Sequence, residues 1–549
     1  MSVKTNYVPT SSSARHKADT GDQPQRFANQ DYEMIRERHL QRNLLFTDKT
    51  FPPNMNSIGS RLEHEFNNHK IEWKRPTDIC KDPHFIVDGT TLFDILQSKI
   101  GNCWVLSAIA SITLKPGLLE KIMPGNQGYS RNYAGIFHFR LWHLGELMDI
   151  VVDDYLPFLD GKFFSVRPSC SNEFWPCLLE KAYAKFLGSY QNLHWGDPSD
   201  AFLNLTGGLT MTFDLGTSMA DTWNMIRSAS PETLMACIRC KKDPPNKTQN
   251  IKQRSHVGDQ RRDHLNNDVR NDNAPEQRYP SVSDHGQGIY AGSRRTSMLN
   301  DKLPENILRG SGLVDRHAYS VTDYTEVPFQ NGFVRLVRIW NPWGYGEWNG
   351  RWSDRCPLWN ELRLEDRLKL QEIEDDGQFW MCWEDFTKEF SHIIICSQVP
   401  EFNDFGDKHK KWSKKTFRDR WTKDKFSWNN IDKDFLMKNS VCTIKVTGSD
   451  QVQIGVNVVV SLMQNSRNQQ RFGDWLPIGF VLIKLSGSKN QLSLTPEIMS
   501  NMKCYQKHQI TESLRLTAGT YAAIPYTTQR KHETSFYFQV FQKSEDCTK

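Results

Sequence analysis

The sequence predicts an α+β fold, in which a region of mixed helices and strands is followed by an antiparallel β-sandwich. Two observations support this fold class. Between about residues 27 and 400, stretches with helical spacing of apolar side chains are interspersed with stretches that alternate apolar and polar residues. After residue 435, short alternating stretches follow one another with turn-forming residues between them, which is typical of a sandwich.

The composition is that of a folded protein with several domains. A length of 549 residues corresponds to about three to five domains. A hydrophobic fraction of 38%, with 17 Trp, requires sizeable cores. The 69 basic and 64 acidic side chains give a formal net charge of +5, which gives no support to nucleic-acid binding through overall charge.

The first block, 27–207, mixes both kinds of secondary structure. We expect a helix over 104–114, because its apolar residues recur near one helical face. Strands are expected within 135–156, and a second helix over 173–187.

The second block, 208–400, has strand patterns that a long polar insertion interrupts at 241–305. The insertion has almost no large apolar side chains, so we expect a solvated surface segment. The alternative is a nucleic-acid-binding arm, which the interleaved Asp residues and scarce aromatics disfavour.

The remaining segments flank these blocks. Residues 1–26 are polar and are expected to be a disordered tail, and 401–435 are expected to be a charged linker to the sandwich at 436–549. No stretch has the ~18 apolar residues of a membrane helix, and the N-terminus lacks a signal-peptide core. The 12 scattered cysteines do not resemble a disulfide framework, so we expect a reduced, cytoplasmic protein.

Cys103 is the first candidate for chemistry. It follows the turn-forming residues Gly101 and Asn102 and begins the apolar helix. The positive end of the helix dipole is expected to lower the pKa of its thiol and favour the nucleophilic thiolate. A buried structural cysteine at a helix start is the plain alternative.

A base and an orienting group come from one predicted hairpin. His317 lies in one strand, Asn341 ends the next, and an Asn-Gly turn signal lies near Phe329, midway between them. Antiparallel pairing would place the two side chains opposite one another, about 5 Å apart at Cβ. A Cys-His-Asn set performs papain-like nucleophilic catalysis, and Gln97 could donate to the oxyanion.

These residues and their surroundings resemble the calpains, over roughly residues 30–240 and 310–400 and more weakly through the sandwich. Three separate motifs match in the right order, together with the segment Glu180-Lys181-Ala182-Tyr183-Ala184-Lys185. The three are Gln97…Gly101-Asn102-Cys103-Trp104, His317-Ala318-Tyr319-Ser320-Val321, and Asn341-Pro342-Trp343-Gly344.

The resemblance implies a two-lobed, papain-like cysteine protease core followed by a C2-like β-sandwich. It implies a calcium-regulated intracellular endopeptidase that makes limited cuts in protein substrates through a thioester acyl-enzyme. Cys103 would lie in the first lobe, with His317 and Asn341 in the second. Trp343 matches the tryptophan that wedges the cleft in the inactive arrangement; simple core packing is its other interpretation.

The resemblance also implies one calcium site in each lobe, built from oxygen ligands that suit this ion. The first-lobe ligands would be the backbone carbonyls of Val87 and Gly89 with the carboxylates of Asp94 and Glu173. The second-lobe ligands would be Glu347, Asp354, Asp376 and the backbone of Glu374, with Gln378 where the family usually has an acidic ligand.

The chain departs from the conventional calpains in ways that bear on regulation. Gln378 removes a formal charge from the second site, and Leu92 replaces an arginine that links the two sites in well-studied members. The sandwich lacks a dense acidic run, and no EF-hand pattern appears, so dimerisation with the conventional small subunit is not expected. The resemblance adds a phospholipid membrane surface as a further candidate partner of the sandwich.

Three alternatives compete with an active protease. A catalytically silent relative would serve as a scaffold, but all members of the Cys-His-Asn set are present. A transglutaminase-like acyl transferase would carry Asp where Asn341 stands. Cys237 and Cys240 have the spacing of half a zinc site, but no second ligand pair follows, so strand packing is the preferred interpretation.

Overall fold

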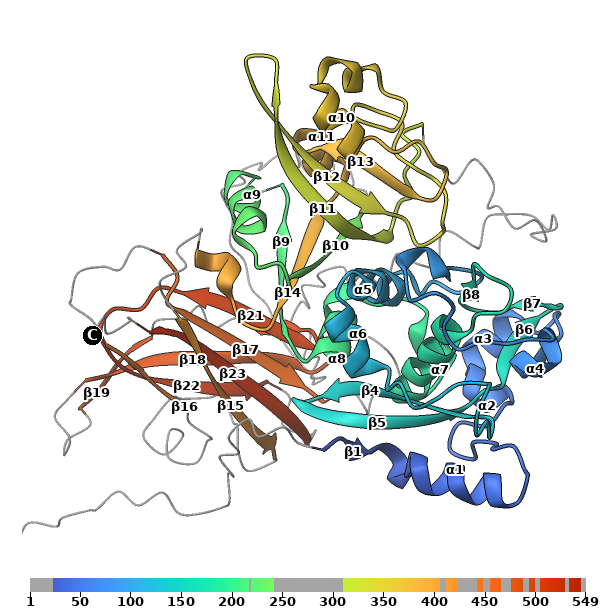
Figure 1. Ribbon diagram of the computed structural model, residues 1–549. Helices are drawn as coiled ribbons and strands as arrows, with labels where there is room; N and C mark the ends of the chain where they lie inside the picture. The colour runs from blue at the N-terminus through green and yellow to red at the C-terminus, as the bar shows by residue number, and fades with distance from the viewer. Residues whose placement is uncertain are drawn as a thin grey trace, which may run out of the picture.

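A computed structural model describes residues 23–216, 219–240, 310–404, 411–422, 442–447, 455–465, 475–486, 493–498, 504–528 and 533–544. Figure 1 shows three bodies: a helix-rich first lobe, a second lobe around a long twisted sheet, and a sandwich that touches both. The expected insertion at 241–305 and the tail up to residue 22 lie outside the described residues.

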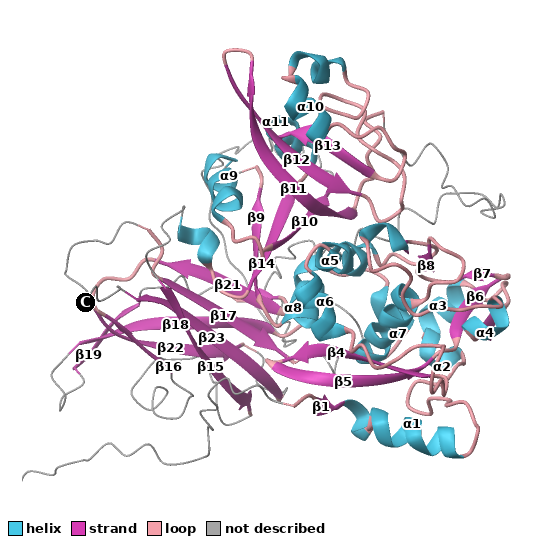
Figure 2. Ribbon diagram, viewed as in Figure 1, coloured by secondary structure: helices cyan, strands magenta, loops and turns pink. Residues whose placement is uncertain are grey.

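The first lobe is built on two long helices and three small sheets (Figure 2). Its helices are η1 (Phe27–Asn29), α1 (Tyr32–Gln41), α2 (Met55–Ile58), α3 (Ser60–Glu65), α4 (Pro76–Ile79), η2 (Leu92–Asp94), α5 (Cys103–Thr113), α6 (Pro116–Ile122), α7 (Trp175–Leu187), η3 (Tyr190–Leu193) and α8 (Pro198–Thr206). Its strands are β1 (Gln25–Arg26), β2 (Ile71–Lys74), β3 (Ile95–Leu96), β4 (Ile136–His143), β5 (Glu146–Asp153), β6 (Leu156–Leu159), β7 (Lys162–Phe163) and β8 (Arg167–Pro168).

The expected helices and hairpin of the first lobe are confirmed as α5, α7, β4 and β5. The tail prediction is wrong at its end, because Gln25 and Arg26 extend the edge of β5 as a parallel strand. Every residue of α5 is buried, since the helix packs against other elements on all sides. The chain can bury so apolar a helix only at the centre of the molecule.

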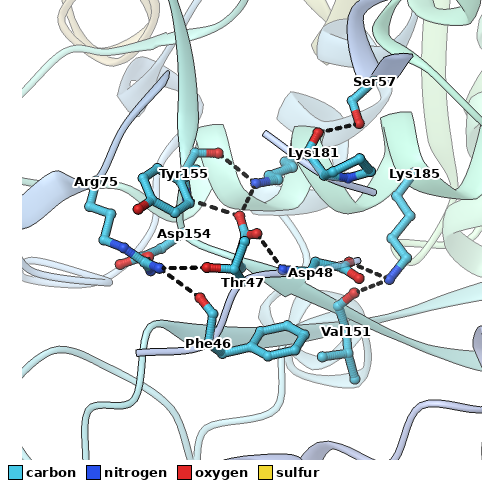
Figure 3. A network of polar contacts seen from close by, with 12 residues as sticks. Phe46, Thr47, Asp48, Ser57, Arg75, Val151, Asp154, Tyr155, Lys181 and Lys185 are labelled. Carbon is cyan, nitrogen blue, oxygen red and sulfur yellow. Dashed lines mark hydrogen bonds and ion pairs between the residues drawn. The ribbon is translucent and has the colours of Figure 1, made fainter. Parts of the chain in front are cut away.

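A buried network of charges holds the first lobe together (Figure 3). The Asp48 N–H donates to Asp153 Oδ2 at 2.6 Å, and Arg75 Nη2 donates to the carbonyl of Phe46 at 2.7 Å. Both contacts fasten the segment before α2 to the end of β5 and to the start of α4. The three ion pairs of the network are Arg75 with Asp154, Lys181 with Asp153, and Lys185 with Asp48.

The second lobe surrounds a six-stranded antiparallel sheet in the order β13-β12-β11-β10-β14-β9. Its strands are β9 (Leu209–Asp214), β10 (Leu234–Arg239), β11 (His317–Phe329), β12 (Gly332–Trp340), β13 (Gln378–Cys382) and β14 (His392–Ser397). Its helices are α9 (Met219–Ser228), η5 (Pro357–Glu361), α10 (Leu364–Leu370), α11 (Trp383–Glu389) and η6 (Glu401–Asp404).

One face of this sheet packs on α5, so the lobes share a core. Leu234, Ala236 and Ala318 belong to the same buried cluster as the apolar residues of α5. The Ser320 hydroxyl donates to the Ser107 carbonyl at 2.8 Å across this contact. The helix that carries Cys103 is therefore fixed directly to the strand that carries His317.

The third body is the predicted sandwich of two antiparallel sheets, in the orders β15-β23-β17-β21 and β16-β22-β18-β19, with β20 paired to β18. Its strands are β15 (Lys411–Trp421), β16 (Cys442–Val446), β17 (Val458–Gln464), β18 (Pro477–Ser486), β19 (Ser493–Ile498), β20 (Tyr505–Gln506), β21 (Gln509–Leu514), β22 (Gly519–Thr527) and β23 (Thr534–Ser544).

The linker predicted over 401–435 is wrong in part, because β15 lies within it and pairs with β23 along its whole length. β15 is an edge strand of its sheet, and its many Lys and Arg residues gave it the composition of a linker.

The sandwich contacts the first lobe at the turn between β4 and β5. Arg418 Nε and Nη2 donate to the carbonyls of Leu144 at 2.8 Å and Gly145 at 2.6 Å, and its Nη1 pairs with Glu146 at 2.7 Å. Tyr537 packs over the same turn, where a Cβ on Gly145 would lie 2.3 Å from its ring. A second contact joins His508 Nδ1 to Asp200 Oδ1 at 2.8 Å.

The close approach at Gly145 predicts a measurable domain contact. Gly145→Ala is expected to lower the free energy of unfolding by about 2–4 kcal/mol, since the methyl group overlaps Tyr537 and the backbone has φ +73. Gly161→Ala is the control: its φ is +81, but nothing lies within 4 Å, so only about 1 kcal/mol is expected. Equal losses in the two variants, measured by urea unfolding, would contradict a tight contact at this turn.

Candidate active site

The first lobe supplies the candidate nucleophile at the start of α5. Cys103 is the first helical residue after Asn102, and its side chain is 7% exposed. Its sulfur lies near the backbone N–H of Ala318, the residue that follows His317 in β11. The two lobes therefore meet at this thiol.

The predicted lowering of the thiol pKa is wrong for this arrangement. Burial raises the pKa of Cys103 to about 11, and the nearby backbone N–H groups of Ala318, Trp104 and Cys103 itself lower it by less. A helix dipole stabilises a thiolate only where water or a counter-charge also reaches it. Cys103 is consequently a neutral thiol here.

His317 and Asn341 are brought together as predicted, but by a different register. β11 and β12 turn at Gln330 and Asn331, and Ser320 pairs with Trp340, so His317 and Asn341 are not directly opposed. A bulge near Thr322 and the end of β12 at Trp340 let the chain bend back. The His317 Nε2 atom then lies 2.8 Å from Asn341 Oδ1.

The surroundings of Asn341 determine which nitrogen of His317 carries the proton. Asn341 Nδ2 donates to the carbonyls of Tyr345 at 2.8 Å and Gly346 at 3.0 Å, so its Oδ1 must face the imidazole. An amide oxygen only accepts, and Nε2–H of His317 is therefore the donor. Nδ1 is left as the basic nitrogen, and burial lowers the pKa of His317 to about 4, so the ring is neutral.

Trp343 covers the imidazole. Its ring centroid lies 4.9 Å from that of His317, and the backbone N–H of Trp343 donates to Asn341 Oδ1 at 3.1 Å. Among the hydrogen bonds of the described residues, none joins the His317 ring to Cys103. His317 is thus a neutral imidazole with a fixed tautomer, and its ring is not hydrogen-bonded to the neutral thiol of Cys103.

Gln97 lies at a contact between the two lobes. Its backbone N–H donates to the Pro342 carbonyl at 2.9 Å, and its side-chain Nε2 donates to the Ile100 carbonyl at 2.9 Å. An amide nitrogen carries two N–H donors, and the bond to Ile100 uses one of them.

The predicted calcium ligands of the first lobe lie in two segments, residues 87–94 and the turn before α7 that holds Glu173. Glu173 Oε1 accepts the Val87 N–H at 2.7 Å, and Asp94 accepts from Trp175 Nε1 at 3.3 Å. Gly89 has φ +97, which turns the loop back. Burial, with a smaller contribution from the charge of Asp94, raises the pKa of Glu173 to about 7.

The second lobe gathers its predicted ligands in the same way. Glu347 Oε1 accepts the Gly377 N–H at 2.9 Å, and the Glu374 N–H contacts Asp354. Burial, reinforced by neighbouring carboxylates, raises the pKa of Glu347 to about 7 and that of Asp354 to about 6. Asp376 accepts the Gln378 N–H at 2.8 Å, and burial raises its pKa as well.

Both candidate sites fit calcium by donor chemistry, because a hard cation relieves the repulsion among partly buried carboxylates. In this arrangement the carboxylates bind backbone N–H groups instead of converging. Within the described ranges, no three His, Cys, Asp or Glu side chains are close enough together to hold a metal ion. Leu92 is buried in the first-lobe core, and Gln378 begins β13 with 8% exposure.

The raised pKa of Cys103 predicts how the rate of its alkylation depends on pH when calcium is chelated. Since the pKa of Cys103 is about 11, its thiolate fraction rises tenfold per pH unit below that value. The rate of Cys103 alkylation by iodoacetamide is expected to rise about 100-fold between about pH 7 and pH 9. Peptide mapping would separate Cys103 from the exposed control Cys170. A plateau near neutral pH would instead reveal a thiolate–imidazolium pair already formed.

Sequence reasoning missed the groups that position the nucleophile. Glu180 of α7 is fully buried and accepts from Asn102 Nδ2, from Ser165 Oγ at 2.5 Å and from the Val166 N–H at 3.1 Å. Burial raises its pKa to about 7. A polar residue directly before Cys103 was the available signal, but its partner 78 residues away could not be identified from spacing.

Among the described residues, no cysteine belongs to a disulfide or to a cluster that could hold a metal ion. Cys237 is buried in the second-lobe core on β10, and all eleven cysteines of the described residues are free. No described helix is both long and apolar enough to span a bilayer.

Comparison with known proteins assigns the family. The family model described as "Calpain family cysteine protease" matches residues 46–397, and the one described as "Calpain large subunit, domain III" matches residues 417–541. The chain is 33% identical to Calpain-13 of Rattus norvegicus over 94% of its length and 69% of the relative. It is 32% identical to the Calpain-2 catalytic subunit of Homo sapiens, over 95% of the chain and 69% of the relative. The chain belongs to the calpain family and is a cysteine peptidase with a calpain protease core and a domain III.

Proposed function

We propose that Cys103, His317 and Asn341 form the catalytic set of a calcium-regulated endopeptidase. His317 Nδ1 takes the thiol proton, and Cys103 sulfur attacks the peptide carbonyl. The oxyanion accepts from the Cys103 N–H and from Gln97 Nε2. His317 then returns the proton to the leaving amine, and water, activated by the same nitrogen, hydrolyses the thioester to regenerate the thiol.

The observation that supports this proposal best is the 2.8 Å contact between His317 Nε2 and Asn341 Oδ1. The two carbonyls that hold the Asn341 amide leave Nδ1 as the free base. That base belongs to the strand whose next residue, Ala318, contacts the Cys103 sulfur.

The same geometry supports regulation by calcium. Val87, Gly89, Asp94 and Glu173 would hold the ion in the first lobe, with the carboxylates turning away from backbone N–H groups. In the second lobe, the ligands would be Glu347, Asp354, Glu374, Asp376 and Gln378. Bound calcium would neutralise the repulsion among these acids. The loop of Asn341 and the loop of Gln97 touch, so a loop shift can move Trp343 off His317.

The setting we propose is cytoplasmic, in line with free cysteines in the described residues. Its substrates are proteins, cut at exposed, extended segments. Binding to a phospholipid surface through the sandwich and independence of a conventional small subunit are further parts of the proposal. We assign no nucleic-acid partner, given a net charge of only +5.

The test is casein cleavage by the full chain and by Cys103→Ala across a calcium titration. We expect cleavage by the wild type that rises with calcium and none by the variant. Cleavage that survives in Cys103→Ala would contradict the catalytic assignment. Full wild-type activity in chelator would contradict calcium regulation and leave the protease assignment intact.

Gln378 offers a separate test of the second site. Gln378→Glu restores a carboxylate beside Asp376, so the calcium concentration at half-maximal activity is expected to fall by about threefold to tenfold. Gln330→Glu adds the same charge at the exposed turn of the same lobe and should leave that concentration unchanged. An unchanged or higher requirement in Gln378→Glu would remove Gln378 from the ligand set.

A further inference from the structure

Trp195 has a strained backbone beside the nucleophile loop. Its φ is +78, a left-handed conformation in which a large aromatic side chain is a genuine outlier. Such strain persists only where surrounding contacts hold it, and it gathers at functional sites. The side chain is only partly buried, so the strain does not serve to fill a core.

Two hydrogen bonds hold this residue against the nucleophile loop. The Trp195 N–H donates to the Gly101 carbonyl at 3.0 Å, and the Gly101 N–H donates to His194 Nδ1 at 3.1 Å. His194 can accept that bond because burial lowers its pKa to about 4 and keeps it neutral. On the other side, a Cβ on Gly196 would lie 2.3 Å from the Trp104 ring, so the chain packs tightly against α5 at this point.

The indole ring lies over Gly101, two residues before Cys103. Its Cδ2 and Cε2 atoms are 3.6 Å from the place where a Cβ on Gly101 would be. His194 supports the ring edge-on, with centroids 5.2 Å apart. When a peptide carbonyl meets the Cys103 sulfur, the side chain of that same residue must lie near this loop.

We propose that Trp195 forms the wall of the subsite that receives the side chain before the scissile bond, and that it selects an apolar or aromatic residue there. This inference rests on the proposed role of Cys103. Indole presents a large apolar face, which favours offset or edge contact with another ring.

Charge around the ring favours an apolar residue over a cationic one. Arg61 Nη2 donates to the His194 carbonyl at 3.4 Å, and the charge of Arg61 lowers the pKa of His194 as well. A Lys or Arg side chain stacked on the indole would therefore lie near an existing cation. Cation–π attraction is weak at a partly exposed site and would be offset by that repulsion.

Trp195→Gly is the decisive variant, because glycine adopts positive φ without strain and the fold should be retained. Peptide substrates that differ only in Phe or Ala before the scissile bond would be cleaved by the full chain with calcium. The ratio of kcat/KM for the Phe peptide to the Ala peptide is expected to fall about tenfold or more in Trp195→Gly. Trp195→Phe should keep most of the preference.

Phe333→Ala is the matched control, since it removes an aromatic side chain that is 70% exposed on the β11–β12 hairpin. It should leave the ratio unchanged. Cys103-dependent cleavage with an unchanged Phe-to-Ala ratio in Trp195→Gly would overturn the subsite alone, as would a wild-type preference for Lys. Cleavage that persists in Cys103→Ala would overturn the catalytic assignment and the subsite with it.

Discussion

Replacing His317 with alanine is expected to lower kcat/KM for peptide cleavage by about 10⁴-fold or more. The variant keeps Cys103 but loses the proposed base, and a thiol with a pKa of about 11 supplies almost no thiolate at neutral pH. Initial rates with a fluorogenic peptide at saturating calcium would measure the loss.

Two further variants make this result specific. Asn341→Ala is expected to lose about 10–100-fold, because the base remains but its tautomer and orientation are no longer held. His64→Ala removes an exposed histidine of α3 and should retain full activity. A His317→Ala enzyme within tenfold of the wild type would show that another group deprotonates the thiol.

Lys181→Met is expected to lower the free energy of unfolding by about 3–5 kcal/mol, the largest stability effect among these variants. Lys181 and Asp153 are both completely buried, and Lys181 Nζ also donates to the Tyr155 carbonyl at 2.5 Å. Methionine fills the same space but leaves the Asp153 carboxylate without its counter-ion. Urea unfolding would measure the loss.

A double variant separates a broken pair from lost packing. Lys181→Met combined with Asp153→Leu removes both charges and is expected to recover part of the loss. Lys121→Met, at an exposed position on α6, should change the free energy of unfolding by less than about 0.5 kcal/mol. A Lys181→Met protein as stable as this control would contradict the role given to the ion pair.

Local patterns in the sequence were sufficient for the elements that hold the site. The apolar run after Asn102 predicted α5, and the Asn-Gly signal predicted the hairpin of β11 and β12. Both signals are local, because helix periodicity and turn chemistry involve only neighbouring residues. The proximity of His317 and Asn341 followed from them, although the turn at Gln330 and Asn331 leaves the two residues out of direct opposition.

Long-range features could not be predicted in this way. The pKa of Cys103 depends on how deeply β11 and α5 bury it, and that burial is a property of the assembled lobes. The bond from Asn102 to Glu180 and the pairing of β15 with β23 likewise join residues far apart in the chain. The left-handed conformation of Trp195 has no signal in its residue type, since tryptophan rarely adopts it.

The most direct test of the central claim is to trap the acyl-enzyme. The wild type would be mixed with calcium and an activated peptide ester, quenched in acid and digested, and the Cys103-containing peptide would be weighed by mass spectrometry. We expect an acyl group on Cys103 that accumulates within the first turnover and is absent from the other cysteines. Turnover of the ester without acylation of Cys103, or with acylation of a different cysteine, would contradict it.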